Sequence, residues 1–231
     1  MISETINRLK RDLPATVKLV AVSKFHPFEA IEEAYEAGQR VFAESRPQEL
    51  LAKVQRLEAI RAERGEPDYM SDIEWHFIGH LQTNKLKMVL PYVSLVQSVD
   101  SVRLLDAIQG WASTNGKKIQ VLLEPHVTAE ESKQGFCPED IYDILKSADK
   151  YPDIIFRGIM GMATFTDDER IIRSDFAALR DIFNTAISCI TTDSFNEFSI
   201  GMSDDYPLAV EYGSTIVRIG SMIFGERVYA K

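Results

Sequence analysis

The stretch Lys18-Leu19-Val20-Ala21-Val22-Ser23-Lys24 decides the fold of this chain. It is a short apolar run with β-branched residues, and it ends on a lysine. Because its apolar residues do not alternate with polar ones, it predicts a strand buried on both faces, as in a parallel sheet covered by helices. Lys24 then lies at the carboxyl end of this strand, where α/β folds place their chemistry.

A lysine at a strand end has two interpretations. An amine that is partly desolvated there loses its proton below the usual pKa of about 10.4, and the neutral amine can attack a carbonyl carbon. Alternatively, the Lys24 ammonium group reaches solvent beyond the end of the strand. The rest of the chain favours the first interpretation, because polar residues also follow the other predicted strands.

Length and composition are those of an ordinary one-domain protein. The chain has 231 residues, enough for an α/β barrel, with 45% hydrophobic and 26% charged residues. Its formal net charge of -9 argues against a nucleic-acid or anionic-membrane surface. No apolar run approaches the roughly 18 residues that span a bilayer, and the N-terminus has no signal-peptide pattern. We expect a cytoplasmic protein in which Cys137 and Cys189 are unpaired thiols.

Strand-like and helical runs alternate along the chain, which predicts parallel βαβ units. An amphipathic lead-in helix comes first, and eight strand-like runs then alternate with helical runs. Because eight parallel strands close a barrel, we expect an α/β fold, a single TIM (β/α)8 barrel with an N-terminal lead-in helix, as one domain over residues 1–231. The alternative is an open doubly wound sheet, but no Gly-rich turn follows the first strand to indicate a dinucleotide fold.

The bounds of these elements follow from apolar periodicity and from Pro and Gly positions. The predicted strands comprise residues 18–24, 39–44, 74–78, 92–97, 118–124, 154–160, 197–200 and 215–219. The predicted helices comprise residues 2–13, 27–37, 47–64, 84–90, 102–113, 138–150, 168–190 and 206–211. His76 and His80 have the spacing of a helical metal pair, but they fall in and after a predicted strand, so no metal site is predicted.

Two loops at the strand ends suggest a phosphate site. Residues 199–203 combine small residues ahead of a predicted helix start, and Gly220-Ser221 follows Arg218 at the end of the eighth strand. Small residues expose backbone N–H groups, and the loops after strands seven and eight are the usual phosphate site of a barrel. The alternative is two ordinary turns with Ser and Asp as helix caps. Their position on adjacent strands, with Lys24 across the closing seam, favours a ligand.

A phosphate beside an imine-forming lysine suggests pyridoxal 5'-phosphate (PLP). Arg218 facing the pyridine nitrogen would keep that nitrogen unprotonated, because an arginine does not give up its proton. Such a partner implies weak carbanion stabilisation. Alternatively, Arg218 forms a salt bridge with a nearby acid such as Glu226.

Five segments resemble the pyridoxal phosphate homeostasis proteins, which are single-barrel relatives of the alanine racemase N-terminal domain. The segments are Val22-Ser23-Lys24 and residues 75–85, 158–162, 199–206 and 213–227. The resemblance implies that Lys24 carries PLP as an internal aldimine and that Arg218 faces the pyridine nitrogen. It places the phosphate at Ser199, Ser203, Gly220 and Ser221, and we also assign Gly201, His80 and Ser45 to the cofactor site.

Two positions depart from the family pattern. Ala43-Glu44-Ser45 stands where the family usually has Gly-Glu-Asn, so that a serine replaces the asparagine near the cofactor. Glu124 stands where the family commonly has an asparagine at the end of the fifth strand. Both changes lie on the ring and substrate side rather than in the phosphate loops. We therefore expect PLP to bind with altered affinity or exposure.

The resemblance implies a PLP-binding protein of intracellular PLP homeostasis. Such a protein buffers the cofactor, delivers it to PLP-dependent apo-enzymes and affects amino-acid metabolism indirectly, and the resemblance favours a monomer. The competing hypothesis is a weak PLP-dependent amino-acid racemase, which needs an acid or base on each face of the substrate α-carbon. Lys24 would serve one face, and His76, His80 or Tyr206 the other. A barrel aldolase with Lys24 as its Schiff-base lysine is the third hypothesis.

Overall fold

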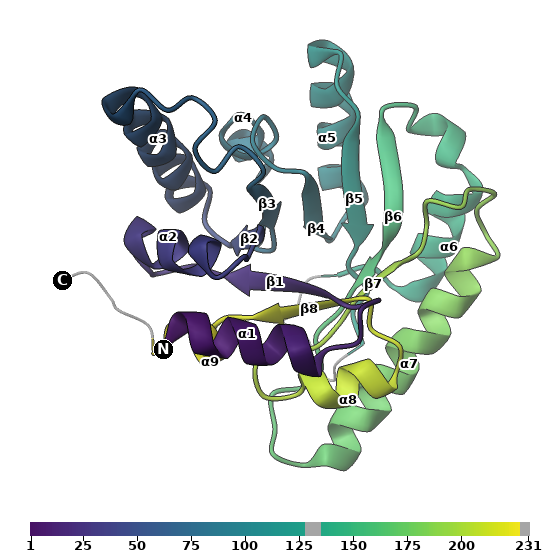
Figure 1. The fold of residues 1–231 in the computed structure, drawn as a ribbon. Helices are drawn as coiled ribbons and strands as arrows, with labels where there is room; N and C mark the ends of the chain where they lie inside the picture. The colour runs from purple at the N-terminus through teal and green to yellow at the C-terminus, as the bar shows by residue number, and fades with distance from the viewer. Residues whose placement is uncertain (128–134, 227–231) are drawn as a thin grey trace.

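The computed structural model describes residues 1–127 and 135–226 and shows a closed barrel of eight parallel strands (Figure 1). The strands lie in sequence order, and β8 (Ile216–Ile219) pairs with β1 (Lys18–Val22) at the closing seam. The predicted TIM barrel with an N-terminal helix is confirmed. Arg227, the last residue of the C-terminal family motif, lies outside the described residues.

Helices alternate with the strands and cover the outside of the barrel (Figure 1). The other strands are β2 (Val41–Glu44), β3 (Glu74–Phe77), β4 (Leu95–Val99), β5 (Ile119–Leu123), β6 (Ile154–Met160) and β7 (Glu197–Ser199). The helices are α1 (Ile2–Asp12), α2 (Phe28–Glu36), α3 (Pro47–Arg64), α4 (Leu86–Val89), α5 (Val102–Asn115), α6 (Pro138–Lys146), α7 (Glu169–Ile187), α8 (Tyr206–Glu211) and α9 (Ser221–Phe224). The lead-in helix α1 packs against α2 and α9.

Side chains of β1 alternate between the barrel interior and the layer under the helices, because successive residues of a strand point to opposite faces. Leu19 and Ala21 belong to the large apolar cluster that includes the helices, whereas Val20 and Val22 belong to a separate cluster of strand residues inside the barrel. β1 ends at Val22, and Lys24 follows two residues later in the turn after the strand. This turn places Lys24 at the carboxyl end of β1, at the mouth of the barrel.

The predicted strand 18–24 ends at Val22, the helix predicted at 84–90 is a 3-10 turn, Thr83–Lys85, followed by α4, and most other bounds differ by one to three residues. Three further differences concern β4, α6 and α9. β4 begins at Leu95 rather than at residue 92, and it continues to Val99 through Gln97, which is buried although it is polar. The helix predicted at 138–150 consists of α6 and a separate 3-10 turn, Ala148–Lys150. The short helix α9 lies in a segment that was predicted as a ligand-binding loop. A buried polar residue and a short helix both escape a prediction that depends on apolar periodicity.

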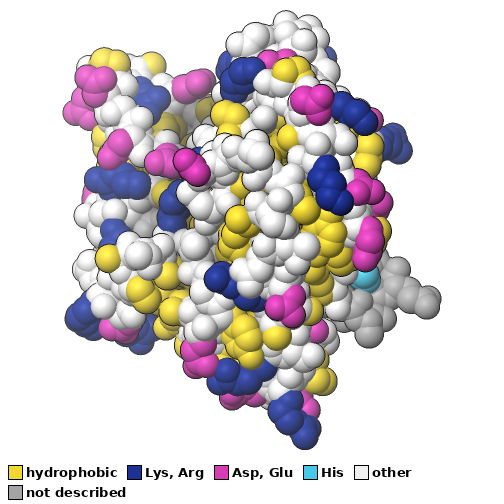
Figure 2. All heavy atoms as spheres, turned by 90° about the vertical axis from the view of Figure 1, so that its right-hand side faces the viewer, with side chains coloured by type: hydrophobic (Ala, Val, Ile, Leu, Met, Phe, Trp, Pro, Cys, Tyr) yellow, Lys and Arg dark blue, Asp and Glu magenta, His cyan; other side chains and the backbone are white. Residues whose placement is uncertain are grey.

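The face seen in Figure 2, on the side of α6 and α7, carries basic and acidic side chains interspersed with apolar ones. Both signs of charge occur there, and neither occupies the whole face. Within residues 1–127 and 135–226, no helix has both the length and the apolar character that a membrane span requires.

Candidate functional site

A cavity of about 410 Å³ lies at the carboxyl ends of β1, β6, β7 and β8. Five of the residues predicted for the site contribute to its lining, and they come from the ends of three strands: Lys24, Ser203, Arg218, Gly220 and Ser221. These residues meet because β1 and β8 pair at the closing seam and β7 lies next to β8. The cavity is large enough for a small organic ligand.

Lys24 occupies a turn that two side chains of α3 hold in place. The turn is closed by a hydrogen bond from His26 N to Ser23 O of 3.1 Å, and Phe25 has a left-handed backbone with φ of 67°. Glu49 Oε1 accepts from Phe25 N at 2.5 Å, and Lys53 Nζ donates to Ser23 O at 2.8 Å. A non-glycine residue in this region costs on the order of 1–2 kcal/mol, so these contacts offset the strain.

The base of this turn rests on a buried ion pair between β2 and α3. Lys53 Nζ lies 2.6 Å from Glu44 Oε1, and the two side chains are 7% and 0% exposed. Ser23 Oγ donates to the same carboxylate oxygen at 2.6 Å. Burial raises the pKa of the Glu44 carboxyl group, and the charge of Lys53 opposes that shift. The pair therefore depends on both partners, because either charge alone would be buried without compensation.

The loops after β7 and β8 are joined by the Ser203 hydroxyl group. Ser203 Oγ accepts from Gly220 N at 3.3 Å and from Met222 N at 3.4 Å. Gly201 is buried and has φ of 92°, and a Cβ atom there would lie 2.5 Å from the Cβ atom of Ala209. Position 201 therefore requires glycine for its backbone conformation and for its close approach to α8.

Arg218 extends from β8 into the barrel and is 4% exposed. Its Nη1 donates to Ser199 O at 2.8 Å and to Ser199 Oγ at 2.7 Å, and its Nη2 donates to Gly161 O at 2.9 Å. Burial lowers the pKa of the guanidinium to about 10, against the charges of Glu124 and Asp205, so it stays protonated at neutral pH. The acids that act on Arg218 are these two rather than Glu226.

Within the described residues, Ser199 does not line this cavity. It is fully buried, and its hydroxyl group donates to Gln97 Oε1 at 2.7 Å while accepting from Arg218. Its contact with a phosphate group stays a prediction.

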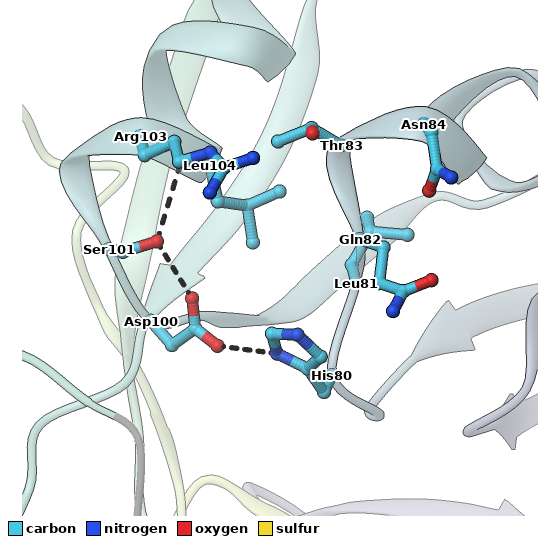
Figure 3. A pocket seen from close by; sticks show the side chains of 9 residues that line it. All are labelled: His80, Leu81, Gln82, Thr83, Asn84, Asp100, Ser101, Arg103 and Leu104. Atoms are coloured by element: carbon cyan, nitrogen blue, oxygen red, sulfur yellow. Dashed lines mark hydrogen bonds and ion pairs between the residues drawn. The ribbon is translucent and has the colours of Figure 1, made fainter.

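His80 belongs to a second cavity, of about 440 Å³, between the segment after β3 and the start of α5. Figure 3 shows His80 and Asp100 pointing toward each other, with Nδ1 and Oδ2 2.9 Å apart, and Arg103 on the far side. The Ser45 backbone packs closely against Gly79, in the segment after β3, where a Cβ atom on Gly79 would come 2.0 Å from the Ser45 carbonyl oxygen. Within the described residues, neither His80 nor Ser45 lines the cavity of Lys24. Their contact with a cofactor stays a prediction.

Glu124, one of the two departures from the family pattern, follows β5 at the mouth of the barrel. Burial raises the pKa of its carboxyl group to about 7, the charge of Asp100 acts in the same direction, and Arg218 opposes it. At neutral pH the Glu124 carboxyl group is therefore only partly ionised, and it supplies less than a full negative charge to the surroundings of Arg218.

Glu124→Gln is expected to remove a pH dependence of stability. The folded pKa of about 7 lies above the usual value of 4.5, so between these values the folded chain keeps a proton that the unfolded chain releases. The stability from this proton is complete below pH 4.5 and is lost as the pH rises to about 7, by about 1.4 kcal/mol per pH unit.

Urea unfolding near pH 5 and pH 7 measures this effect. The free energy of unfolding should be lower at pH 7 than at pH 5 in the wild type. In Glu124→Gln this decrease should be smaller by roughly 2 kcal/mol. The exposed Glu139→Gln is the control and should keep the wild-type pH dependence. Equal pH dependence in Glu124→Gln and the wild type would contradict the raised pKa.

His26 is a cavity residue that the sequence-based prediction missed. It is 8% exposed, its ring stacks on Phe224 with centroids 5.3 Å apart, and burial lowers its pKa. Its position, two residues after Lys24 in the sequence, is the signal that could have identified it as a site residue. The segment after β6 also lines the cavity, where Phe165 is 91% exposed and Thr164 N donates to Asp175 Oδ2 at 2.7 Å.

Fold and site together define an α/β barrel protein with a ligand cavity at the carboxyl ends of its strands, lined by a lysine that follows the first strand and an arginine of the last. The family model "Alanine racemase, N-terminal domain" matches residues 1–228, and the chain belongs to this family. Its relatives include the pyridoxal phosphate homeostasis proteins of Haemophilus influenzae (35% identical over 215 residues, 93% of this chain and 87% of the relative) and of Homo sapiens (38% over 242 residues, 100% and 84%). The resemblance to that family is confirmed.

Solved structures agree with this assignment. The structure of PipY from Synechococcus elongatus PCC7942 with PLP bound is 32% identical, has a TM-score of 0.85, and covers 97% of this chain and 100% of PipY. Alanine racemase from E. faecalis is 17% identical with a TM-score of 0.71, over 97% of this chain and 57% of the racemase, which shows a shared fold alone.

Proposed function

We propose that this chain binds PLP in the cavity of Lys24 and acts in intracellular PLP homeostasis. The observation that carries the proposal is the lining of one cavity by Lys24, Arg218 and the loops after β7 and β8. The PLP bound to PipY and the names of the homeostasis relatives support the choice of ligand.

Each lining residue has a role in this proposal. Bound PLP would supply an aldehyde that a primary amine can hold covalently, with release of water. Lys24 supplies the amine, and the turn held by α3 directs it into the cavity. Arg218, which keeps its proton at neutral pH, faces the ring nitrogen. Ser203, Gly220 and Ser221 hold the phosphate group through hydroxyl and backbone N–H donors.

Three side chains were considered as the second base of a racemase. Their positions favour binding and delivery of PLP over racemisation. His76 is 1% exposed inside the barrel, and His80 lies in the second cavity. In the part of the chain that the structure describes, neither these histidines nor Tyr206 lines the cavity of Lys24. The proposal includes a monomeric cytoplasmic protein, one barrel domain over residues 1–231, that passes PLP to PLP-dependent apo-enzymes.

Absorbance and mass test this function directly. The purified chain, incubated with PLP, should gain a visible absorbance band that borohydride removes. Peptide mass analysis should then find a phosphopyridoxyl group on Lys24. A chain that gains neither band nor adduct would overturn the proposal, and the barrel aldolase hypothesis would take its place.

A further inference from the structure

A chain of hydrogen bonds crosses the barrel interior from Arg218 to His76. Arg218 Nη1 lies 2.7 Å from Ser199 Oγ, Ser199 Oγ lies 2.7 Å from Gln97 Oε1, and Gln97 Nε2 lies 2.8 Å from His76 Nδ1. The four side chains come from β8, β7, β4 and β3, and none is more than 4% exposed. The proposed function assigns no role to Gln97 or His76.

The donor and the acceptor of each of these hydrogen bonds follow from the Arg218 guanidinium at one end of the series. Because a guanidinium only donates, Ser199 Oγ accepts from Arg218, and the hydroxyl hydrogen goes to Gln97 Oε1. The Gln97 amide then turns its NH₂ group toward His76, whose Nδ1 must be unprotonated. Burial lowers the pKa of His76 to about 3, so the imidazole is neutral and able to accept.

The hydroxyl group is the part of this arrangement that can rotate. Within the described residues, three of the five N–H groups of Arg218 donate hydrogen bonds, to Ser199 O, Ser199 Oγ and Gly161 O. Two of these acceptors are backbone carbonyls in fixed positions. A rotated Ser199 hydroxyl would turn its hydrogen toward the guanidinium, and the acceptor at Gln97 prevents that rotation.

We propose that Gln97 positions Arg218 through the Ser199 hydroxyl group, and that His76 fixes the orientation of the Gln97 amide. This inference rests on the proposed function, in which Arg218 faces the ring nitrogen of PLP. The guanidinium is then ordered before the cofactor arrives, so that binding does not have to order it. Hydrogen bonds in a chain also polarise one another, which strengthens the contact at Arg218.

Gln97→Met tests the inference, because methionine has a similar size and forms no such hydrogen bonds. The Kd for PLP should rise roughly tenfold. The visible band and its pH titration should shift as well, which a purely structural role would not cause. Gln109→Met is the matched control, since the Gln109 amide also makes two hydrogen bonds, with Asp153 at 2.9 and 3.0 Å, on the outside of the barrel. It should keep the wild-type Kd and band.

A double-mutant cycle tests the path through Ser199. Ser199→Ala should raise the Kd about as much as Gln97→Met, and in that background Gln97→Met should add less than about a twofold increase. Independent, multiplying effects would overturn the inference, as would a wild-type Kd and band in Gln97→Met. If Gln97→Met does not fold, a wild-type Kd in Ser199→Ala overturns it instead. A wild-type chain that binds no PLP refutes the proposed function, which is a separate outcome.

Discussion

Lys24→Ala is expected to abolish the borohydride-reducible adduct completely while the barrel stays folded. The C=N bond requires a primary amine in the cavity, and Lys24 supplies it in the proposed function. Lys24 lies in a turn after β1 rather than in either apolar cluster, so its truncation removes little packing. Mass analysis after reduction should find no phosphopyridoxyl group, and the thermal midpoint should stay near that of the wild type.

Lys18→Ala is the matched control for this experiment. Lys18 is the first residue of β1, at the end of the strand opposite to the Lys24 turn, and its Nζ is 3.5 Å from Glu197 Oε1. The variant should form the adduct as the wild type does. If Lys24→Ala kept the adduct, another lysine would carry the cofactor. If Lys24→Ala unfolded, Lys24 would be structural and the proposed site would be wrong.

Lys53→Met is expected to destabilise the protein by about 3–5 kcal/mol, the usual cost of removing one partner of a buried ion pair. The change leaves Glu44 fully buried without its cation, and it removes the donor to Ser23 O at the base of the Lys24 turn. Urea unfolding at neutral pH measures the loss. Arg56→Met on the same helix is the control, since the Arg56–Glu63 pair is 47% and 64% exposed and should contribute less than about 1 kcal/mol.

A second substitution identifies the cause of that loss. Adding Glu44→Gln to Lys53→Met removes the uncompensated charge while an amide oxygen still accepts from Ser23, so the double variant should regain at least half of the lost stability. A double variant as unstable as the single one would mean that packing of Lys53, rather than its charge, stabilises this region.

The barrel and the position of Lys24 could be predicted because both depend on local patterns. Apolar runs and their alternation with helices are visible in the sequence, and Lys24 directly follows the first of these runs. Arg218 was predicted for a similar reason, since it lies one residue before the end of a recognisable strand that Gly220 and Ser221 follow. These positions required no knowledge of how distant strands face each other.

The surroundings of Arg218 could not be predicted, because they depend on contacts across the barrel interior. The contact of Ser199 with a phosphate group stays a prediction, but the place of its hydroxyl group between Arg218 and Gln97, which are on different strands, was not predicted. That contact depends on which side chains of β4 and β7 meet across the barrel interior, and no periodic pattern in the sequence determines this. For a related reason, the contact of His80 with Asp100 was not predicted. The direction of the His80 side chain depends on the path of the segment after β3.

The seam between β1 and β8 has a consequence for biosynthesis. Lys24 follows the first strand, and Arg218, Gly220 and Ser221 belong to β8 and the segment after it, so the cavity exists only once the last strand has paired with the first. A nascent chain on the ribosome therefore lacks this cavity until β8 has been translated. A ligand of the cavity then cannot guide early folding, and contacts of such wide sequence separation favour a late and slow closure of the barrel.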